Sequence, residues 1–160
     1  MPSPIAFIIP ALNEEAALAP MLDGLRAALD AAACADGDVV VVDNGSRDAT
    51  PTLARKHGAR VVSEPRRGYG QACLAGIAAL SSGTDTVVFL DADGSDDPED
   101  LVRLLAPVRE GKADLALGSR TTAAKFSGAF THRQAFGNWL ATGLIRVLFG
   151  ATIRTLGHSG

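Results

Sequence analysis

Residues 87–98, Val-Val-Phe-Leu-Asp-Ala-Asp-Gly-Ser-Asp-Asp-Pro, run from an apolar stretch through a cluster of acids to a proline. The apolar residues, as part of Thr86–Leu90, predict a buried strand. The final Asp-Pro pair predicts the start of a helix, because aspartate is a good helix cap and proline suits the first helical turn. Asp91 and Asp93 are therefore expected at the point where a buried strand ends.

The rest of the chain repeats this order of strand and helix. Apolar runs predict further strands at Ile5–Ile9, which Pro10 is expected to stop, and at Val39–Val42, Ala59–Ser63 and Leu115–Leu117. Helical patterns cover Glu14–Ala33, Thr50 to about His57 with Thr50 as the cap, Gly70–Leu80, the residues after Asp97, and the amphipathic stretch His132–Phe149. This alternation predicts an α/β fold with an open, mostly parallel sheet and helices on both faces, in a single domain over residues 1–160.

Ligands of such sheets bind outside the carboxyl ends of the strands. Four segments are expected at this edge: Pro10–Glu14, Asp43–Asp48, Asp91–Asp97 and Ser119–Arg120. Asp43 opens the stretch Asp-Asn-Gly-Ser, which is typical of a tight turn because Asn-Gly tolerates positive φ. The same turn would aim the Asp43 carboxylate at the base or ribose of a ligand, and the two interpretations are compatible.

The acids after the 86–90 strand have two interpretations. Carboxylates this close repel one another unless a cation screens them, and Mg²⁺ takes one or two protein carboxylates together with water and phosphate oxygens. A plain acidic turn that caps the next helix explains Asp97 better, whereas Asp91 and Asp93 favour a metal because a cap needs only one acid. A calcium loop is excluded, because its glycine and glutamate positions hold Asp96 and Val102.

Other nucleotide-binding signatures are missing. The turn after the first predicted strand, Pro10-Ala-Leu-Asn13, has no glycine, so it is neither a P-loop nor a dinucleotide-binding turn. Gly68-Tyr-Gly70 begins like a dinucleotide motif, but Cys73 stands where the last glycine belongs. The same glycine-poor first loop argues against a sugar-phosphate nucleotidyltransferase, and nothing in the sequence indicates nucleic acid as a partner.

Composition indicates a globular protein. The chain has 160 residues, 47% of them hydrophobic, and a net charge of −3. The balance is −9 over residues 1–100 and +6 over residues 101–160, which is either accidental or an acidic metal-holding end beside a basic phosphate- or membrane-facing end. Cys34 and Cys73 lie outside metal-ligand spacing and favour a reducing cytoplasm. Because no apolar run approaches the roughly 18 residues of a membrane span, we expect a cytoplasmic protein, at most peripheral to the inner face of a membrane.

Five motifs together resemble a known family. They are Pro10-Ala-Leu-Asn-Glu-Glu15, Val-Val-Asp-Asn-Gly-Ser-Arg-Asp-Ala-Thr50, Arg-Gly-Tyr-Gly70, Leu-Asp-Ala-Asp93 and Gly-Ser-Arg120, in this order. The chain resembles family-two glycosyltransferases of the GT-A fold, a Rossmann-like α/β fold. The closest likeness is to the branch that transfers mannose or glucose to dolichol phosphate or another polyprenyl phosphate.

The resemblance implies transfer of a sugar, with inversion, from a nucleoside-diphosphate sugar to a lipid phosphate. It implies that Mg²⁺ or Mn²⁺ binds Asp91 and Asp93 as a DXD motif, and that Asp93, Arg120 and Arg133 act in catalysis. The implied nucleotide-sugar-binding residues are Pro10, Ala11, Asn13, Glu14, Asp43, Asp91 and Ala92. The two arginines would hold the acceptor phosphate against the donor.

The last predicted helix carries Arg133 and Arg146 and no acid, so it either covers the sheet or rests on anionic headgroups. Family members usually continue further, with an acid and a Gly-x-Phe-Arg-like segment where this chain reads Arg154-Thr-Leu-Gly-His-Ser-Gly160. We therefore expect a domain truncated at its C-terminal end. The alternative to an active enzyme is a non-catalytic remnant that still binds a nucleotide sugar.

Overall fold

The computed structural model describes residues 5–32 and 34–118. The chain divides into two compact units, Met1–Ala116 and Leu117–Gly160, and nearly all described residues belong to the first. The predicted loop Ser119–Thr131 and the predicted helix His132–Phe149 lie outside the described residues. No helix in the described ranges is long and apolar enough to span a membrane.

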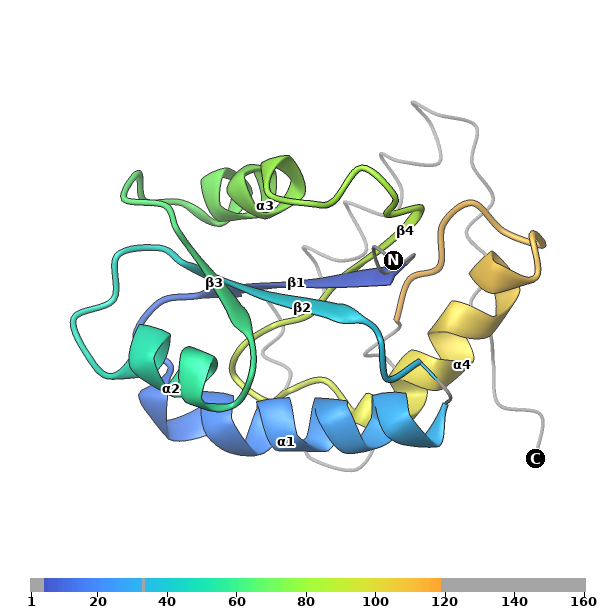
Figure 1. Cartoon of the computed structure of the whole chain (residues 1–160), viewed down its shortest axis with the longest axis horizontal. Coiled ribbons are helices and arrows are strands. Elements are labelled where there is room, and N and C mark those ends of the chain that lie inside the picture. Colours follow the sequence, from blue (N-terminus) through green and yellow to red (C-terminus); the bar gives the residue numbers. More distant parts are fainter. Residues whose placement is uncertain (1–4, 33, 119–160) are drawn as a thin grey trace, which may run out of the picture. The chain divides into compact units, whose positions relative to one another are not determined.

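The first unit is built on a four-stranded parallel sheet (Figure 1). Its strands are β1 (Ile5–Ala11), β2 (Asp38–Asp43), β3 (Arg60–Ser63) and β4 (Thr86–Phe89), in the order β3-β2-β1-β4. The central strand β1 pairs with β2, Ala6 opposite Asp38, and with β4, Ile5 opposite Thr86. All carboxyl ends therefore point to one edge, which confirms the predicted α/β fold class.

Helices cover both faces of this sheet (Figure 1). Helices α1 (Glu15–Ala31), α2 (Thr50–Lys56) and α4 (Pro98–Arg109) cover one face, and α3 (Tyr69–Ala78) covers the other. Alternate residues of β1 point to opposite faces, so Phe7 packs in the core with Leu18, Leu25 and Leu29 of α1, while Ile8 packs in the core with Ala72 of α3. This double burial explains the unbroken valine run of β2, since both of its faces lie in a core.

Helix α3 approaches the sheet closely at Gly76. A Cβ atom at this position would lie 2.5 Å from Ile8 Cγ2 and 3.2 Å from Val42 Cγ2. Only a glycine fits between the helix backbone and these two side chains without displacing one of them. The close approach holds α3 against β1 and β2.

Four local predictions were wrong. The strand before Asp91 was expected to be buried, but Val87 and Phe89 of β4 are exposed, because β4 is an edge strand of the described sheet and α3 packs mainly over β1 and β2. Pro10 was expected to stop the first strand, yet β1 runs to Ala11, because the proline nitrogen faces β4 where that strand has already ended. Thr50 was expected to cap the second helix, but Ala49 occupies the cap and Thr50 is the first helical residue. Leu115–Leu117 form no strand: Leu115 and Leu117 are exposed, and no described strand pairs with them.

Candidate functional site

The ends of β1, β2 and β4 bring three of the four predicted segments to one edge of the sheet. Pro10 and Ala11 finish β1, with Ala11 buried and Pro10 half-buried. Asp43 finishes β2, and Asp91 lies two residues past the end of β4. The fourth segment, Ser119–Arg120, lies outside the described residues, as does Arg133.

The loop after β1 is joined to the loop after β2 through Asn13. The backbone amide of Asn13 donates to Ser46 Oγ at 3.0 Å, and its side-chain oxygen accepts from the Arg47 amide at 2.8 Å. Asn13 adopts the left-handed conformation, with φ of 57°. Asparagine is tolerated there better than most residues, so this residue both turns the chain and ties the two loops together.

A second set of contacts continues the connection toward α1 and α2. The amide of Glu14 donates to Thr50 Oγ1 at 2.9 Å, and the amide of Glu15 donates to Asp48 Oδ2 at 3.2 Å. The Glu15 carboxylate in turn accepts from the Ala49 amide at 3.0 Å. Hydrogen bonds, first from the Thr50 hydroxyl, lower the pKa of Asp48. The amides at the start of α1 are thus paired with side chains at the start of α2, and the Ala49 amide at the start of α2 with a side chain of α1.

Asp43 forms the tight turn that its sequence predicted. Its Oδ1 accepts from the Ser46 amide at 2.9 Å, and Gly45 has the positive φ of 86° that such a turn needs. The turn holds a half-buried carboxylate at the edge of the sheet, between the ends of β1 and β3. The contact of Asp43 with a ligand stays a prediction.

The acidic loop after β4 is organised by its own carboxylates. Asp96 Oδ2 accepts from the Asp91 amide at 3.0 Å, and Asp93 Oδ1 accepts from the Ser95 amide at 2.9 Å. Ala92 is 4% exposed, whereas Asp93 is exposed to solvent. Ala92 is therefore buried between two acids, of which Asp93 is exposed and Asp91 is half-buried.

The start of α3 lies near this acidic loop. Partial burial, together with the neighbouring Cys73, Asp91 and Asp96, raises the pKa of Tyr69. Burial also raises the pKa of the Cys73 thiol, and the charge of Asp91 adds to the effect. The charge of Asp91 thus acts on the first turn of α3, whereas the connection that leads into this helix begins beside the end of β2.

The donor set fits a hard divalent cation. Asp91 and Asp93 supply carboxylate oxygens at alternate positions, which are the ligands that Mg²⁺ and similar ions prefer. Within residues 5–32 and 34–118, no three His, Cys, Asp or Glu side chains form a group that could hold a metal ion. An ion bound here would therefore take its remaining ligands from water and from the phosphates of a substrate.

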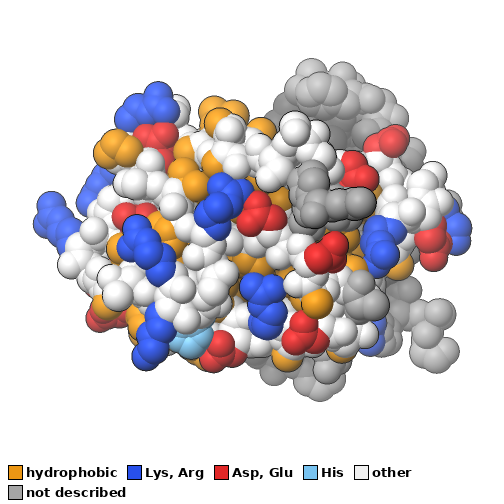
Figure 2. All heavy atoms as spheres, in the orientation of Figure 1, with side chains coloured by type: hydrophobic (Ala, Val, Ile, Leu, Met, Phe, Trp, Pro, Cys, Tyr) orange, Lys and Arg blue, Asp and Glu red, His pale blue; other side chains and the backbone are white. Residues whose placement is uncertain are grey.

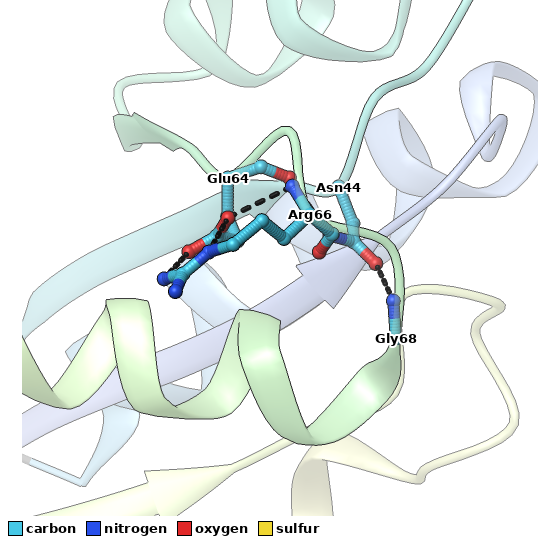
Figure 3. Close-up of polar contacts among 4 residues, drawn as sticks. All are labelled: Asn44, Glu64, Arg66 and Gly68. Carbon is cyan, nitrogen blue, oxygen red and sulfur yellow. Dashed lines mark hydrogen bonds and ion pairs between the residues drawn. The ribbon is translucent and has the colours of Figure 1, made fainter.

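Sequence reasoning missed the role of Asn44, which it assigned only to a turn. Asn44 is 5% exposed, and its side chain makes three hydrogen bonds to the loop that links β3 to α3 (Figure 3). Its partners, Glu64, Arg66 and Gly68, are 20 or more residues away in sequence. No local pattern signals such a contact, because only the parallel pairing of β2 with β3 brings these residues together.

Charges are mixed on the face of the molecule drawn in Figure 2. Basic and acidic side chains lie interspersed there, with hydrophobic side chains showing between them. In the described part of the chain, some charged side chains are paired, such as Arg60 with Asp38 at 2.6 Å and His57 with Asp23 at 2.7 Å. Exposed pairs of this kind contribute little to stability. Because acidic and basic side chains alternate on the face drawn in Figure 2, that face shows no patch of a single charge sign.

Comparison with known proteins identifies the family. The model of glycosyl transferase family 2 matches residues 6–157. An uncharacterised glycosyltransferase of Mycobacterium tuberculosis is 44% identical over 116 residues, which cover 72% of this chain and 48% of that protein. The undecaprenyl-phosphate mannosyltransferase of Micrococcus luteus is 41% identical over 120 residues, 71% of this chain and 46% of that protein.

A solved structure shows the same fold. Glucosyl-3-phosphoglycerate synthase of Mycobacterium tuberculosis, in complex with Mn²⁺ and UDP-glucose, superposes with a TM-score of 0.58 at 35% identity, covering 68% of this chain and 40% of that one. The chain therefore belongs to glycosyl transferase family 2, and the resemblance to its polyprenyl-phosphate branch and GT-A fold is confirmed. The chain spans about half the length of the curated relatives it matches.

Proposed function

We propose that this protein is a metal-dependent, inverting glycosyltransferase that moves a hexose from a nucleoside-diphosphate sugar to a polyprenyl phosphate. One observation carries the proposal. In a chain of this family, Asp43 and the Asp91–Asp93 pair come from strands on either side of β1 and reach the same edge of the sheet. We assign the nucleoside to the Asp43 side of β1 and the diphosphate to the Asp91–Asp93 side.

The donor would lie along this edge. Asp43 would accept hydrogen bonds from the base or ribose, next to Pro10, Ala11, Asn13 and Glu14 at the end of β1. Asp91 and Asp93, with Ala92 between them, would face the diphosphate. A divalent ion bound there would neutralise the charge that builds on the leaving diphosphate. The synthase that shares this fold has been solved with Mn²⁺ and UDP-glucose and with Mg²⁺ and UDP, which supports this assignment.

The acceptor phosphate needs little help from a base, because it is already ionised. Its oxygen would form the new bond to the anomeric carbon while the bond from that carbon to the diphosphate oxygen breaks. Attack opposite the leaving group inverts the configuration, and the nucleoside diphosphate departs with the electron pair. Holding two anions together is the main task, which we assign to Arg120 and Arg133. The Micrococcus relative, named for undecaprenyl phosphate, supports a lipid phosphate as acceptor.

A thermal-shift experiment tests the donor site. UDP, GDP and dTDP are each added with and without Mn²⁺ to the wild type and to Asp93→Ala. A ligand at about 100 times its dissociation constant stabilises a fold by roughly 2.7 kcal/mol, which is a rise of several degrees in melting temperature. We expect such a rise with one nucleotide, dependent on Mn²⁺ and lost in the variant.

The matched control is Asp36→Ala, which removes an exposed acid between α1 and β2, at the opposite edge of the sheet. It should keep the full shift. Absence of a shift with all three nucleotides, from a wild type that melts cooperatively, would contradict the donor site. Transfer of labelled sugar to undecaprenyl phosphate then separates an enzyme from a protein that only binds the nucleotide.

A further inference from the structure

Asn44 uses both hydrogens and the oxygen of its amide on a single loop. Its Nδ2 donates to the carbonyl oxygens of Glu64 and Arg66, each at 2.8 Å, and its Oδ1 accepts from the Gly68 amide at 2.8 Å (Figure 3). The side chain is buried, so each of these bonds replaces one that water would otherwise make. We call residues 64–68 the clamped loop.

The clamped loop is also anchored at its first residue. The amide of Glu64 donates to the backbone oxygen of Asp43 at 2.9 Å. The Glu64 carboxylate, with its side chain 6% exposed, accepts from the amide, Nε and Nη2 of Arg66 at 2.9, 3.0 and 2.7 Å. The guanidinium of Arg66 is thereby committed to Glu64 within the loop (Figure 3).

The clamped loop runs along the edge where the predicted donor residues lie. It begins at the backbone of Asp43 and leads into α3, whose first residue, Tyr69, lies near Asp91. Gly68 has a φ of 134°, which only glycine adopts readily, and its amide is held by Asn44. Arg67, between the two held residues, makes no hydrogen bond or ion pair among the described residues.

We propose that Asn44 is a positioning residue for the nucleotide-sugar site, because it fixes the clamped loop against the end of β2. The proposal rests on the proposed function. A nucleoside diphosphate bound between Asp43 and Asp91 would then meet a loop that is already ordered and carries an uncommitted cation at Arg67. Binding a preformed site costs less conformational entropy than ordering the loop on binding.

The chemistry at this position requires an amide. An aspartate of the same shape would lose both donors and place a carboxylate against the carbonyl oxygens of Glu64 and Arg66. Serine is too short to reach the three partners, and it introduces no charge. Asn44→Asp and Asn44→Ser therefore break the clamp in two different ways, one with a buried charge and one without.

Two measurements test the proposal. Limited trypsin digestion without ligand reports on the loop, since Arg66 and Arg67 are cleavage sites within it. Calorimetric titration with UDP, GDP and dTDP, each with Mn²⁺, reports on binding. The control is Leu29→Ala, which removes a fully buried side chain at the end of α1 away from the clamped loop and lowers stability without touching the loop. It shows how far reduced stability alone changes either readout.

We expect both Asn44 variants to be cut after Arg66 or Arg67 about tenfold faster than the wild type, because cleavage follows the population of the open loop. We also expect them to bind the nucleotide about tenfold more weakly, as a loosened site does. Leu29→Ala should bind like the wild type. If the aspartate variant does not fold, the digestion and titration of Asn44→Ser alone test the role of Asn44.

Opposite outcomes separate the two proposals. A wild type that binds nucleotide, with Asn44→Ser binding equally well, would overturn the role of Asn44 and leave the proposed function standing. Equal weakening in Leu29→Ala would also overturn it, because lost stability would then explain the effect. A wild type that binds none of UDP, GDP and dTDP contradicts the donor site itself, and the role of Asn44 falls with it.

Discussion

The side-chain oxygen of Asn13 accepts a hydrogen bond from the backbone amide of Arg47, 2.8 Å away and 34 residues further along the chain. This bond joins the loop after β1 to the loop after β2 at the edge where we place the donor. The backbone of Asn13 turns the chain at the same place, with a φ of 57°. Both its side chain and its backbone therefore shape the connection between the two loops.

Two variants of Asn13 separate these contributions. Asn13→Gly and Asn13→Ala both lose the bond to Arg47, but only glycine accepts the left-handed backbone without strain. The alanine variant should therefore be less stable than the glycine variant by about 1 kcal/mol. Urea unfolding measures the difference, and equal midpoints at equal slopes would show that the backbone relaxes at this residue.

Thr50→Val should be costly although it barely changes the volume of the side chain. The fully buried Thr50 hydroxyl accepts from the Glu14 amide and donates to Asp48, so its loss leaves a partly buried donor without a partner. We expect a loss of about 1–3 kcal/mol in the free energy of unfolding. Thr52→Val, at an exposed position of the same helix, should change it by less than about 0.5 kcal/mol, and a similar loss there would point to helix propensity instead.

The two glycines of α3 should respond to alanine in opposite directions. Gly76→Ala places a Cβ 2.5 Å from Ile8 Cγ2 and should destabilise the protein by about 1–3 kcal/mol through overpacking. Gly70 lies in the same helix, and a Cβ atom there would have no other atom within 4 Å. Gly70→Ala should therefore stabilise the protein by roughly 0.5–1 kcal/mol. Thermal melting of both variants tests this, and a neutral Gly76→Ala would mean that α3 moves away from the sheet at little cost.

Glu64 should make the protein sensitive to acid. Hydrogen bonds from the Arg66 side chain, and then from the Arg66 amide, lower the pKa of Glu64 from 4.5 to about 2. Since the folded pKa lies below the unfolded one, its contribution is complete above pH 4.5 and is lost as the pH falls toward 2. Melting temperatures across this window should therefore fall less steeply for Glu64→Gln than for the wild type.

The control for that measurement is Glu110→Gln, at an exposed position just after α4. It should keep a slope close to that of the wild type. If Glu64→Gln also kept the wild-type slope, the ion pair with Arg66 would not form in solution. The clamped loop would then be held by Asn44 and by the bond from the Glu64 amide to the Asp43 backbone oxygen.

Most of the fold was predictable because strand and helix patterns are local. The apolar runs gave β1, β2 and β4 to within two residues, and Asp97-Pro98 marked the start of α4. Pro10 misled because its effect depends on the neighbouring strand: proline stops a strand only where the ladder needs its amide. The strand predicted at Leu115–Leu117 was wrong because an apolar triplet forms a strand only where it can pair with another strand.

The candidate site was predictable as a set of segments but not as a set of contacts. Parallel strands must end at one edge, so Asp43 and Asp91 were expected at the same edge of the sheet. The hydrogen bonds of Asn13, Asn44 and Thr50 all cross between loops that are far apart in sequence, and each of these side chains also suits a local turn or cap. Local propensity therefore accounts for the presence of these residues in turns and caps, but it gives no sign of their long-range hydrogen-bond partners.

The strand order also has a consequence for how the protein folds. In β3-β2-β1-β4, the pairing of Ala6 with Asp38 closes a short stretch of chain, whereas the pairing of Ile5 with Thr86 closes a long one. Contacts between residues distant in sequence form late and slow the reaction. The Asp43 turn can thus assemble while the acidic loop is still unfolded, and the docking of β4 becomes the step that completes the edge.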